Sequence, residues 1–195
     1  MIRFLAVLFS LVLLLALAAG GASLYVFWRF GRDLPDYSQL ADYRPAVMSR
    51  VHAGDGTLIA EFAHQRRLFV PIAAMPKQVI QAFLAAEDKT FYTHPGIDFA
   101  GIASAMLRNI KNIGGKRRPV GASTITQQVA KNFLLTNELS IARKIKEAIL
   151  AFRIEHAFSK DRILELYLNE IYLGLGSYGV AAAALNYFDK SLDEL

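Results

Sequence analysis

The sequence predicts a mainly α-helical domain behind a single N-terminal transmembrane helix, with a small β-hairpin leading into the domain. No charged residue lies between Phe4 and Trp28, and a bilayer core needs only about 20 apolar residues in a helix. Two strand-like runs flank Asp55-Gly56, which is a typical hairpin turn. After Pro76 the apolar residues recur at helical spacing, so we expect helices throughout the rest of the chain.

The apolar N-terminal run is longer than the core of a cleaved signal peptide, which spans roughly 7 to 15 residues. We therefore expect an uncleaved anchor over residues 1–28, although the small residues at 16–20 would also suit a signal peptidase. Arg3 precedes the apolar run, and Arg29 and Arg32 follow it, so the balance of positive charge does not choose an orientation.

Residues 29–49 contain Pro35 and Pro45, which interrupt any helix, and we interpret this segment as a stalk. Residues 50–195 are enough for one domain. The chain of 195 residues has no cysteine, which excludes disulfides, thiolate metal sites and a cysteine nucleophile. Its net charge of +5 suits an anionic partner such as phospholipid, pyrophosphate or nucleic acid, but such a surplus is also common on solvated surfaces.

Glu87 is the first candidate for chemistry. In a helix that begins at Pro76, it shares one side with Ile80, Phe83 and Leu84. We therefore expect Glu87 to be partly buried at the end of an apolar stripe. Burial disfavours the charged form of a carboxylate, which would suit proton exchange near neutral pH. A glutamate that turns into water at the helix end is an equally good interpretation.

The turn at residues 94–96 begins with His94, and a lone histidine in a turn is more often a structural hydrogen-bonding group than a base. Asp98 can cap the helix that follows. The apolar residues of this helix are spaced for one buried face and are Phe99, Ile102, Met106 and Ile110. The basic, glycine-rich run at 111–119 fits either a solvated loop or a mobile basic flap over an anionic lipid or substrate.

A second polar motif begins with Thr124 and Gln127, which have the spacing of a capping box. Gln128 and Lys131 follow Thr124 at i+4 and i+7, so one helix face carries a hydroxyl, an amide and an ammonium group. The N-terminus of a helix also presents unpaired amides to anions. The motif therefore resembles a phosphate cradle, and a cap followed by a plain surface is the alternative.

A helix is also predicted over residues 140–157, where polar and apolar residues lie on opposite sides. The expected core stripe consists of Ile141, Ile145, Ala148 and Phe152. Arg143, Lys144 and Glu147 gather on the other side, where ordinary surface ion pairing would explain them. Ser159 then starts a further helix that buries Ile163, Leu166, Tyr167 and Ile171.

Four motifs in this order resemble the signature series of the peptidoglycan glycosyltransferases, glycosyltransferase family 51, which includes the class A penicillin-binding proteins. The motifs are AAEDKTFYTHPG at 85–96, GASTITQQVAKN at 121–132, RKIKEA at 143–148 and KDRILELYLNEIYLG at 160–174. The preceding segments SRVHAGDGTLIAEF and RRLFVPI are similar to those of the bifunctional class A members.

The resemblance implies a lysozyme-like, mostly helical domain that sits half-sunk in the outer face of the cytoplasmic membrane. It implies a single-pass protein of the inner membrane with its catalytic domain on the periplasmic side. Its implied substrates are lipid II and the growing glycan strand, with membrane lipid and other cell-wall synthesis proteins as further partners and no nucleic acid. In the reaction that the resemblance implies, the 4-hydroxyl of one disaccharide attacks the anomeric carbon of the growing chain with inversion, and undecaprenyl pyrophosphate is expelled.

By motif match, Glu87 would be the general base and Glu147 the second catalytic glutamate, which assists the donor side. The positive charge for the pyrophosphate would come from Lys131, Arg143 and Lys144. The neutral residues that match the donor site are Ser123, Thr124, Gln127, Gln128 and Asn132. The supporting positions of the first motif, also counted with the substrate-binding set, are Asp88, Phe91 and His94.

No cofactor is expected. A divalent cation such as Mg²⁺ could help to neutralise the pyrophosphate, but no ligand cluster in the sequence demands one. A lysozyme-like hydrolase with Glu87 as its acid is the main rival, and an inactive anchored scaffold is another. A hydrolase would not need the cations, because its leaving group is a sugar. We also expect the domain to be incomplete at its C-terminus and the transpeptidase domain to be absent, since no suitable Ser-x-x-Lys element occurs.

Overall fold

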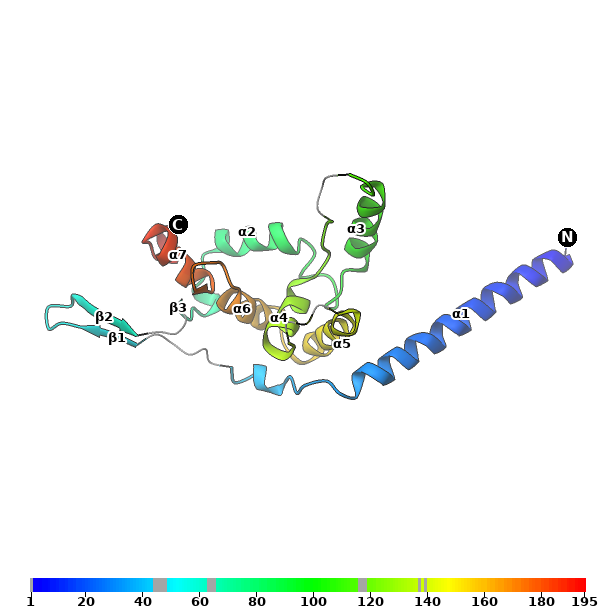
Figure 1. Cartoon of the computed structure of the whole chain (residues 1–195), viewed down its shortest axis with the longest axis horizontal. Helices are drawn as coiled ribbons and strands as arrows, with labels where there is room; N and C mark the ends of the chain where they lie inside the picture. The colour runs from blue at the N-terminus through cyan, green and yellow to red at the C-terminus, as the bar shows by residue number, and fades with distance from the viewer. Residues whose placement is uncertain (1, 44–48, 63–65, 116–118, 137, 139) are drawn as a thin grey trace.

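The computed structural model describes residues 2–43, 49–62, 66–115, 119–136, 138 and 140–195. The molecule is elongated, with a long N-terminal helix at one end, a β-hairpin at the other and a helical body between them (Figure 1). Pro45 of the predicted stalk and residues 116–118 of the predicted basic flap lie outside the described residues.

The helices are α1 (Ile2–Gly31), α2 (Lys77–Glu87), α3 (Phe99–Lys111), α4 (Ile125–Leu134), α5 (Ile141–Ala157), α6 (Lys160–Glu170) and α7 (Val180–Phe188). The strands are β1 (Ser49–His52), β2 (Leu58–Phe62), β3 (Arg66–Arg67) and β4 (Ser177–Tyr178). Short 3₁₀ segments lie at Ser38–Leu40, Ile72–Ala74 and Leu192–Glu194.

The predicted anchor corresponds to α1, which continues past Trp28 to Gly31. The stretch Arg3–Gly31 is long and apolar enough to cross a membrane, and its apolar window is not buried against the body. At the C-terminal end of α1, the carbonyl oxygen of Gly31 accepts a hydrogen bond from the guanidinium of Arg153 in α5 at 3.2 Å. The anchor is therefore joined to one of the helices of the body.

The predicted hairpin is confirmed, because β1 and β2 pair antiparallel around the turn at Asp55-Gly56. The expectation of helices throughout after Pro76 is wrong at β4, which pairs in parallel with β3. Glycines with positive φ at Gly174, Gly176 and Gly179 interrupt the chain around this strand, a conformation that disfavours helix. The pairing ties the segment before α2 to the segment before α7.

Side chains cap the predicted starts of four helices. These N-caps are Asp98 for α3, Thr124 for α4, Ser140 for α5 and Ser159 for α6. Each accepts a hydrogen bond from an amide of the first turn, which has no acceptor inside the helix. Pro76 is the N-cap of α2 rather than its first residue, so that helix begins at Lys77.

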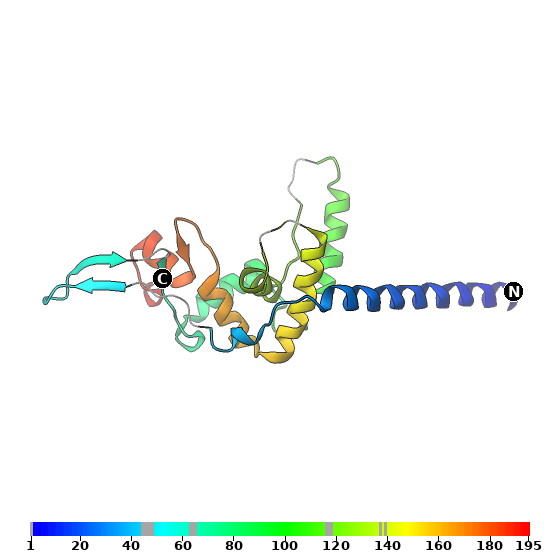
Figure 2. The ribbon, with the colours of Figure 1, turned by 60° about the horizontal axis from the view of Figure 1, so that its bottom comes forward.

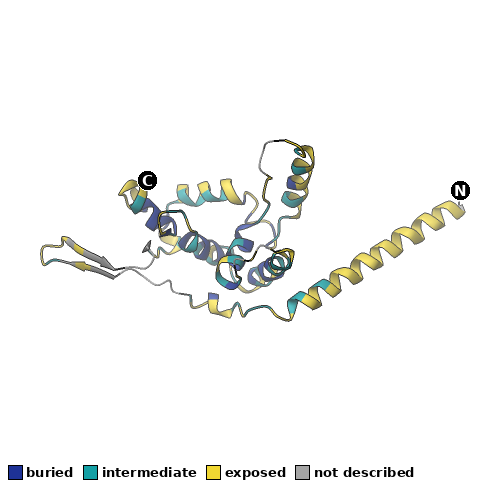
Figure 3. Cartoon of the chain, viewed as in Figure 1, coloured by how far each residue is buried: buried dark blue, intermediate teal, exposed yellow. Residues whose placement is uncertain are grey.

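The core lies where α4, α5 and α6 pack together (Figure 3). Its buried residues include Ile125, Val129, Leu150, Ile154, Ile163, Leu164, Leu166 and Leu168. Leu40 of the predicted stalk also joins this core, and Arg162 of α6 donates to its carbonyl oxygen at 2.9 Å. This part of the stalk is therefore packed on the body.

The expected buried face of α3 is wrong. Phe99, Met106 and Ile110 are exposed, and Ala105 is the residue of this helix that is buried. The helix stands out from the body, so no described element covers its apolar side (Figure 1). The apolar spacing predicted the helix correctly and its environment incorrectly.

The expected orientation of α5 is also wrong. Ile141 is 83% exposed, whereas Glu147 on the supposed surface side is 1% exposed. The side that carries Glu147 faces α4, and the neighbouring cations Arg143 and Lys144 compensate the buried carboxylate. Ionic pairing thus lets the polar side of this helix face inward.

Two alanine substitutions in α5 should separate the observed orientation from the predicted one. Leu150→Ala removes a side chain with 0% exposure and should lower the free energy of unfolding by about 2–5 kcal/mol. Ile141→Ala should change it by less than about 0.5 kcal/mol. Denaturant unfolding of the detergent-solubilised chain measures both. An Ile141→Ala cost equal to that of Leu150→Ala would contradict the observed face.

Candidate active site

The sequence motifs converge on a cavity of about 470 Å³ beside the end of α2. We call it the cation pocket. It is lined by Ala86, Glu87, Gly121, Ser123, Gln127, Gln128, Lys131, Arg143, Lys144 and Glu147. Most of the predicted site residues therefore share one cavity, although they come from three separate stretches of the sequence.

A neighbouring cavity of about 420 Å³ lies between α3 and the segment that leads into α4, and we call it the α3 pocket. Its polar lining residues include Asp88, Lys89, Thr90, Asp98, Ser104, Arg108 and Thr124. Glu87 and Ser123 line this cavity as well as the cation pocket. Glu87 therefore stands where the two cavities meet.

The positive side of the cation pocket is organised by the buried carboxylate of Glu147. One of its oxygens pairs with the guanidinium of Arg143, and the other accepts from the Lys144 ammonium at 2.7 Å. Lys144 also donates to the hydroxyl of Ser123 at 2.6 Å, which joins α5 to the second motif. Burial lowers the pKa of Lys144, and the nearby charges of Arg143 and Lys131 lower it further.

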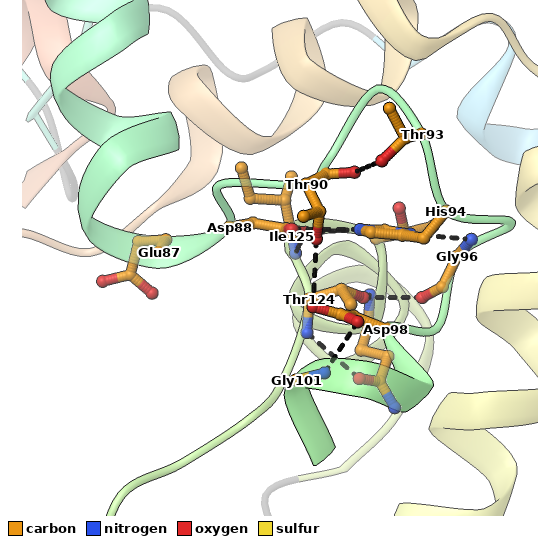
Figure 4. Close-up of polar contacts among 12 residues, drawn as sticks. Glu87, Asp88, Thr90, Thr93, His94, Gly96, Asp98, Gly101, Thr124 and Ile125 are labelled. Carbon is orange, nitrogen blue, oxygen red and sulfur yellow. Dashed lines mark hydrogen bonds and ion pairs between the residues drawn. The ribbon is translucent and has the colours of Figure 1, made fainter. Parts of the chain in front are cut away.

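Glu87 is the last residue of α2 and is exposed, so its expected burial is wrong. None of the residues of α2, all of which the structure describes, is buried. Figure 4 shows the Glu87 carboxylate on the opposite side of the chain from the side chains of Asp88 and His94. One of its oxygens accepts a hydrogen bond from the Gln128 amide at 2.8 Å, which points the carboxylate toward α4.

Asp88 and His94 form a buried pair (Figure 4), and Asp88 also lines the α3 pocket. The Nε2 atom of His94 lies 2.9 Å from the Asp88 carboxylate, and Nδ1 accepts the amide of Gly96 at 3.1 Å. Because Nδ1 accepts a hydrogen bond, we place the ring proton on Nε2, which donates a hydrogen bond to the Asp88 carboxylate. The same carboxylate accepts the amide of Ile125 at 3.0 Å, so Asp88 connects the turn to the first residue of α4.

The predicted capping box is present. Thr124 accepts from the amide of Gln127 at 3.2 Å, and the Gln127 side chain accepts from the amide of Thr124 at 3.1 Å. The Thr124 hydroxyl donates to the carbonyl oxygen of Gly96 at 2.6 Å. Together with the bond from Ile125 to Asp88, these contacts occupy amides that were expected to cradle a phosphate. The helix terminus binds the protein's own groups, and the positive charge of the cation pocket comes from Lys131, Arg143 and Lys144.

Three predicted substrate-binding residues line neither cavity. Phe91 is fully buried and His94 almost so, because both pack beneath the turn that they stabilise. Asn132 is exposed and lies one position beyond Lys131, which turns it away from the cation pocket. His94 therefore has the structural position that its place in a turn predicted.

The α3 pocket was not predicted from the sequence, although the sequence contains a signal for it. Gly101, Ser104, Ala105 and Arg108 are spaced at i, i+3, i+4 and i+7 and all line this pocket. They form a stripe of small and polar residues on the side of α3 away from its exposed apolar residues. Among the described residues, no group of three or more His, Asp or Glu side chains could hold a metal ion.

Comparison with known proteins shows the family of this chain. Residues 55–195 match the protein family described as transglycosylase. The chain is 56% identical over 181 residues to penicillin-binding protein 1A of Rickettsia felis, covering 93% of this chain and 23% of that protein. It is 58% identical over 171 residues to the protein of that name from Rickettsia prowazekii, covering 88% of this chain and 22% of that protein.

The protein of the same name from Escherichia coli K12 is 43% identical over 188 residues, covering 96% of this chain and 22% of that protein. The chain thus spans less than a quarter of the length of these curated relatives. The matched region contains both cavities and all four motifs. The chain belongs to the transglycosylase family and is similar to the N-terminal part of penicillin-binding protein 1A.

Proposed function

We propose that this chain is a peptidoglycan glycosyltransferase that polymerises lipid II, with Glu87 as the general base. The observation that carries this proposal is the position of Glu87 at the edge of a pocket that also contains Lys131, Arg143 and Lys144. These three cations outnumber the two carboxylates of the cation pocket, Glu87 and Glu147, and suit a pyrophosphate.

The proposed reaction joins an acceptor disaccharide to the growing strand. Glu87 removes the proton from the 4-hydroxyl of the acceptor, and the resulting oxygen attacks the anomeric carbon of the donor with inversion. The bond from that carbon to the pyrophosphate oxygen breaks, and its electron pair leaves with undecaprenyl pyrophosphate. Because Gln128 donates to one oxygen of Glu87, it can hold the carboxylate while the other oxygen accepts the proton.

Glu147 has a different role in this proposal. It is 1% exposed and is paired with Arg143 and Lys144, so it holds the two cations at the donor side. Cations that are already positioned stabilise the developing negative charge with little rearrangement during the reaction. We therefore expect Glu147 to support departure of the pyrophosphate rather than to accept the acceptor's proton.

The α3 pocket is the proposed position of the acceptor sugar. It lies across Glu87 from the cation pocket and shares Ser123 with it. A base between two cavities can reach a hydroxyl in one and direct it at a carbon in the other. Arg108 and Lys89 give the α3 pocket polar groups that could bind an acceptor.

The exposed apolar side of α3 supports contact with the membrane. Phe99, Met106, Leu107, Ile110 and Ile113 are all exposed. In both ribbon views, α3 and the inner end of α1 lie on the same side of the body, away from the hairpin (Figures 1 and 2). We propose that this side rests on the outer face of the inner membrane, so that the cavities open near the lipid-linked substrate and lie on the periplasmic side.

The proposed partners are lipid II, the growing strand and membrane lipid, together with other cell-wall synthesis proteins. No cofactor is required in this proposal, and a divalent cation such as Mg²⁺ could assist at the pyrophosphate.

The hydrolase alternative leaves the three cations of the cation pocket without a role, because a sugar leaving group carries no phosphate. Digestion of purified glycan strands in the absence of lipid II would favour the hydrolase. Growth and polymer synthesis that stay unchanged in cells carrying Glu87→Gln would favour the scaffold.

Glu87→Gln should abolish polymerisation, with a loss of about 10²–10⁴-fold in rate, because the amide cannot accept the proton. The measurement is strand length on a gel after incubation with labelled lipid II in detergent. Asp189→Asn is the matched control, since it neutralises an exposed carboxylate at the end of α7. Equal strand synthesis by Glu87→Gln and the wild type would remove Glu87 from the mechanism.

Lys144→Arg should extend activity to higher pH. The pKa of Lys144 is lowered by burial and by Arg143 and Lys131, so its charge is lost earlier than usual as pH rises. Arginine stays protonated in this range. The KM for the strand donor, measured across the alkaline range, should therefore rise later in the variant. Lys190→Arg, an exposed site, is the control, and superimposable profiles of wild type and Lys144→Arg would contradict the assignment.

A single probe at Ile110 should report lipid contact. The chain has no cysteine, so Ile110→Cys and Ile59→Cys each carry one unique label. Both positions are exposed, but Ile110 lies on α3 and Ile59 lies on the hairpin. In liposomes, a lipid-attached quencher should reduce fluorescence at position 110 and leave position 59 accessible to a water-soluble quencher. Equal access to water at both sites would exclude the proposed contact.

A further inference from the structure

The position of Glu87 depends on the turn that follows it. The helix that ends at Glu87 has no fully buried residue, and its apolar side chains Val79, Ile80, Phe83 and Leu84 pack against the core only partly buried. The next residue, Asp88, is buried and accepts the amide of Ile125 at 3.0 Å. Glu87 is therefore located by the clamped turn at residues 88–96 as well as by the partly buried contacts of its own helix.

The turn is also clamped at its far end. Gly96 has a φ of +91°, and a Cβ atom at this position would lie 2.8 Å from the carbonyl oxygen of Ala151 and 2.9 Å from Cγ of Glu155. The backbone of the turn is therefore pressed directly against α5. Its contact with Glu155 connects it to a polar cluster outside both cavities.

Lys160 is the cation of this cluster. Its ammonium donates to the carbonyl oxygen of His94 at 2.7 Å and lies 4.5 Å from the ring centroid of Phe91. It also donates to the carboxylate of Glu155 at 2.8 Å. Lys160 thus contacts the turn twice, once at the backbone and once at a buried ring, while its side chain is 21% exposed.

Glu155 links the cluster to the other motif. The oxygen that accepts from Lys160 also accepts the hydroxyl of Thr126 at 2.6 Å, and the Glu155 side chain is 7% exposed. Thr126 lies in the first turn of α4, two residues before Gln128, which binds Glu87. One carboxylate therefore joins α4, α5 and α6 to the turn below Glu87.

We propose that Lys160 and Glu155 are positioning residues for Glu87. They touch neither cavity, and they act by holding the turn at 88–96 against the start of α4, which keeps Glu87 within reach of Gln128. This inference rests on the proposed function for its kinetic consequence. Its structural part, the clamping of the turn, stands independently of any activity.

Arg162 provides a matched control from the same turn of α6. Like Lys160, it pairs with a carboxylate, that of Glu165, and donates to backbone carbonyl oxygens. Those carbonyls belong to Leu40 and Ala41 of the stalk, at 2.9 and 3.1 Å. Arg162→Met therefore removes a comparable set of bonds without touching the turn.

The test compares Lys160→Met with Arg162→Met in detergent, at a temperature at which thermal melting shows both variants to be folded. Lys160→Met should lower kcat by roughly 10- to 100-fold, because a displacement of the base by about 1 Å is enough for such a loss. The KM for lipid II should stay near the wild-type value, since the cation pocket is intact. Arg162→Met should keep the wild-type kcat.

Hydrogen exchange of the amides in residues 88–96 gives a readout that does not require activity. Exchange should accelerate in Lys160→Met and stay unchanged there in Arg162→Met. If Lys160→Met leaves Glu155 unpaired and unfolds the chain, the double variants Lys160→Met/Glu155→Gln and Arg162→Met/Glu165→Gln replace the single ones, because each removes both charges.

An active wild type with equal kcat in the two variants would overturn the positioning role. An inactive wild type would count against the proposed polymerase, and the exchange measurement would then decide the clamp by itself. Unchanged exchange at 88–96 in Lys160→Met would overturn the clamp whatever the activity.

Discussion

The carboxylate of Asp88 is the interaction on which the rest of the site depends. It accepts the ring proton of His94 and the amide of Ile125, so it ties the first motif to the start of α4. A buried carboxylate that loses either donor keeps the cost of its desolvation, which makes the arrangement stable only as a unit. Because Glu87 precedes Asp88 directly, the pair sets the place of an exposed carboxylate through buried contacts. Asp88 thus fixes the backbone through buried contacts, while its neighbour Glu87 keeps its carboxylate accessible in the cavities.

In the cation pocket, unlike the buried Asp88–His94 pair, the charged side chains line the cavity itself. Glu147 is buried and meets both Arg143 and Lys144, so the two cations are held close together despite their mutual repulsion. A buried ion pair of this kind contributes little net stability, because desolvation offsets the attraction. Its physical effect is to fix two positive groups in a partly desolvated cavity, where an anion is attracted more strongly than in water. Stability is supplied elsewhere, by the apolar contacts of α4, α5 and α6.

Residues close together in the sequence predicted where the helices start, but they predicted little of how the helices pack. Asp98, Thr124 and Ser159 cap the helices that they were expected to start, because a cap depends on residues within one turn. Ser140 caps the helix that was predicted to begin at about that residue. Most of the cation pocket was predicted as well, since each motif carries its own polar group. The Lys160 cluster was missed because its members are far apart in sequence and individually ordinary. The α3 pocket was missed because the apolar side of α3, and not its small and polar side, was expected to face the body.

The predicted buried faces of α3 and α5 were both wrong, and the two predictions failed for different physical reasons. A periodic apolar stripe predicts a core only when water is the solvent and the opposite side is plain surface. In α3 the stripe is exposed, and lipid is the proposed environment that makes such exposure favourable. In α5 the polar side turns inward because Glu147 is neutralised by its own helix neighbours at i−4 and i−3. Hydrophobic spacing located both helices, and the departures from it mark the two surfaces assigned here to the membrane and to the anionic substrate.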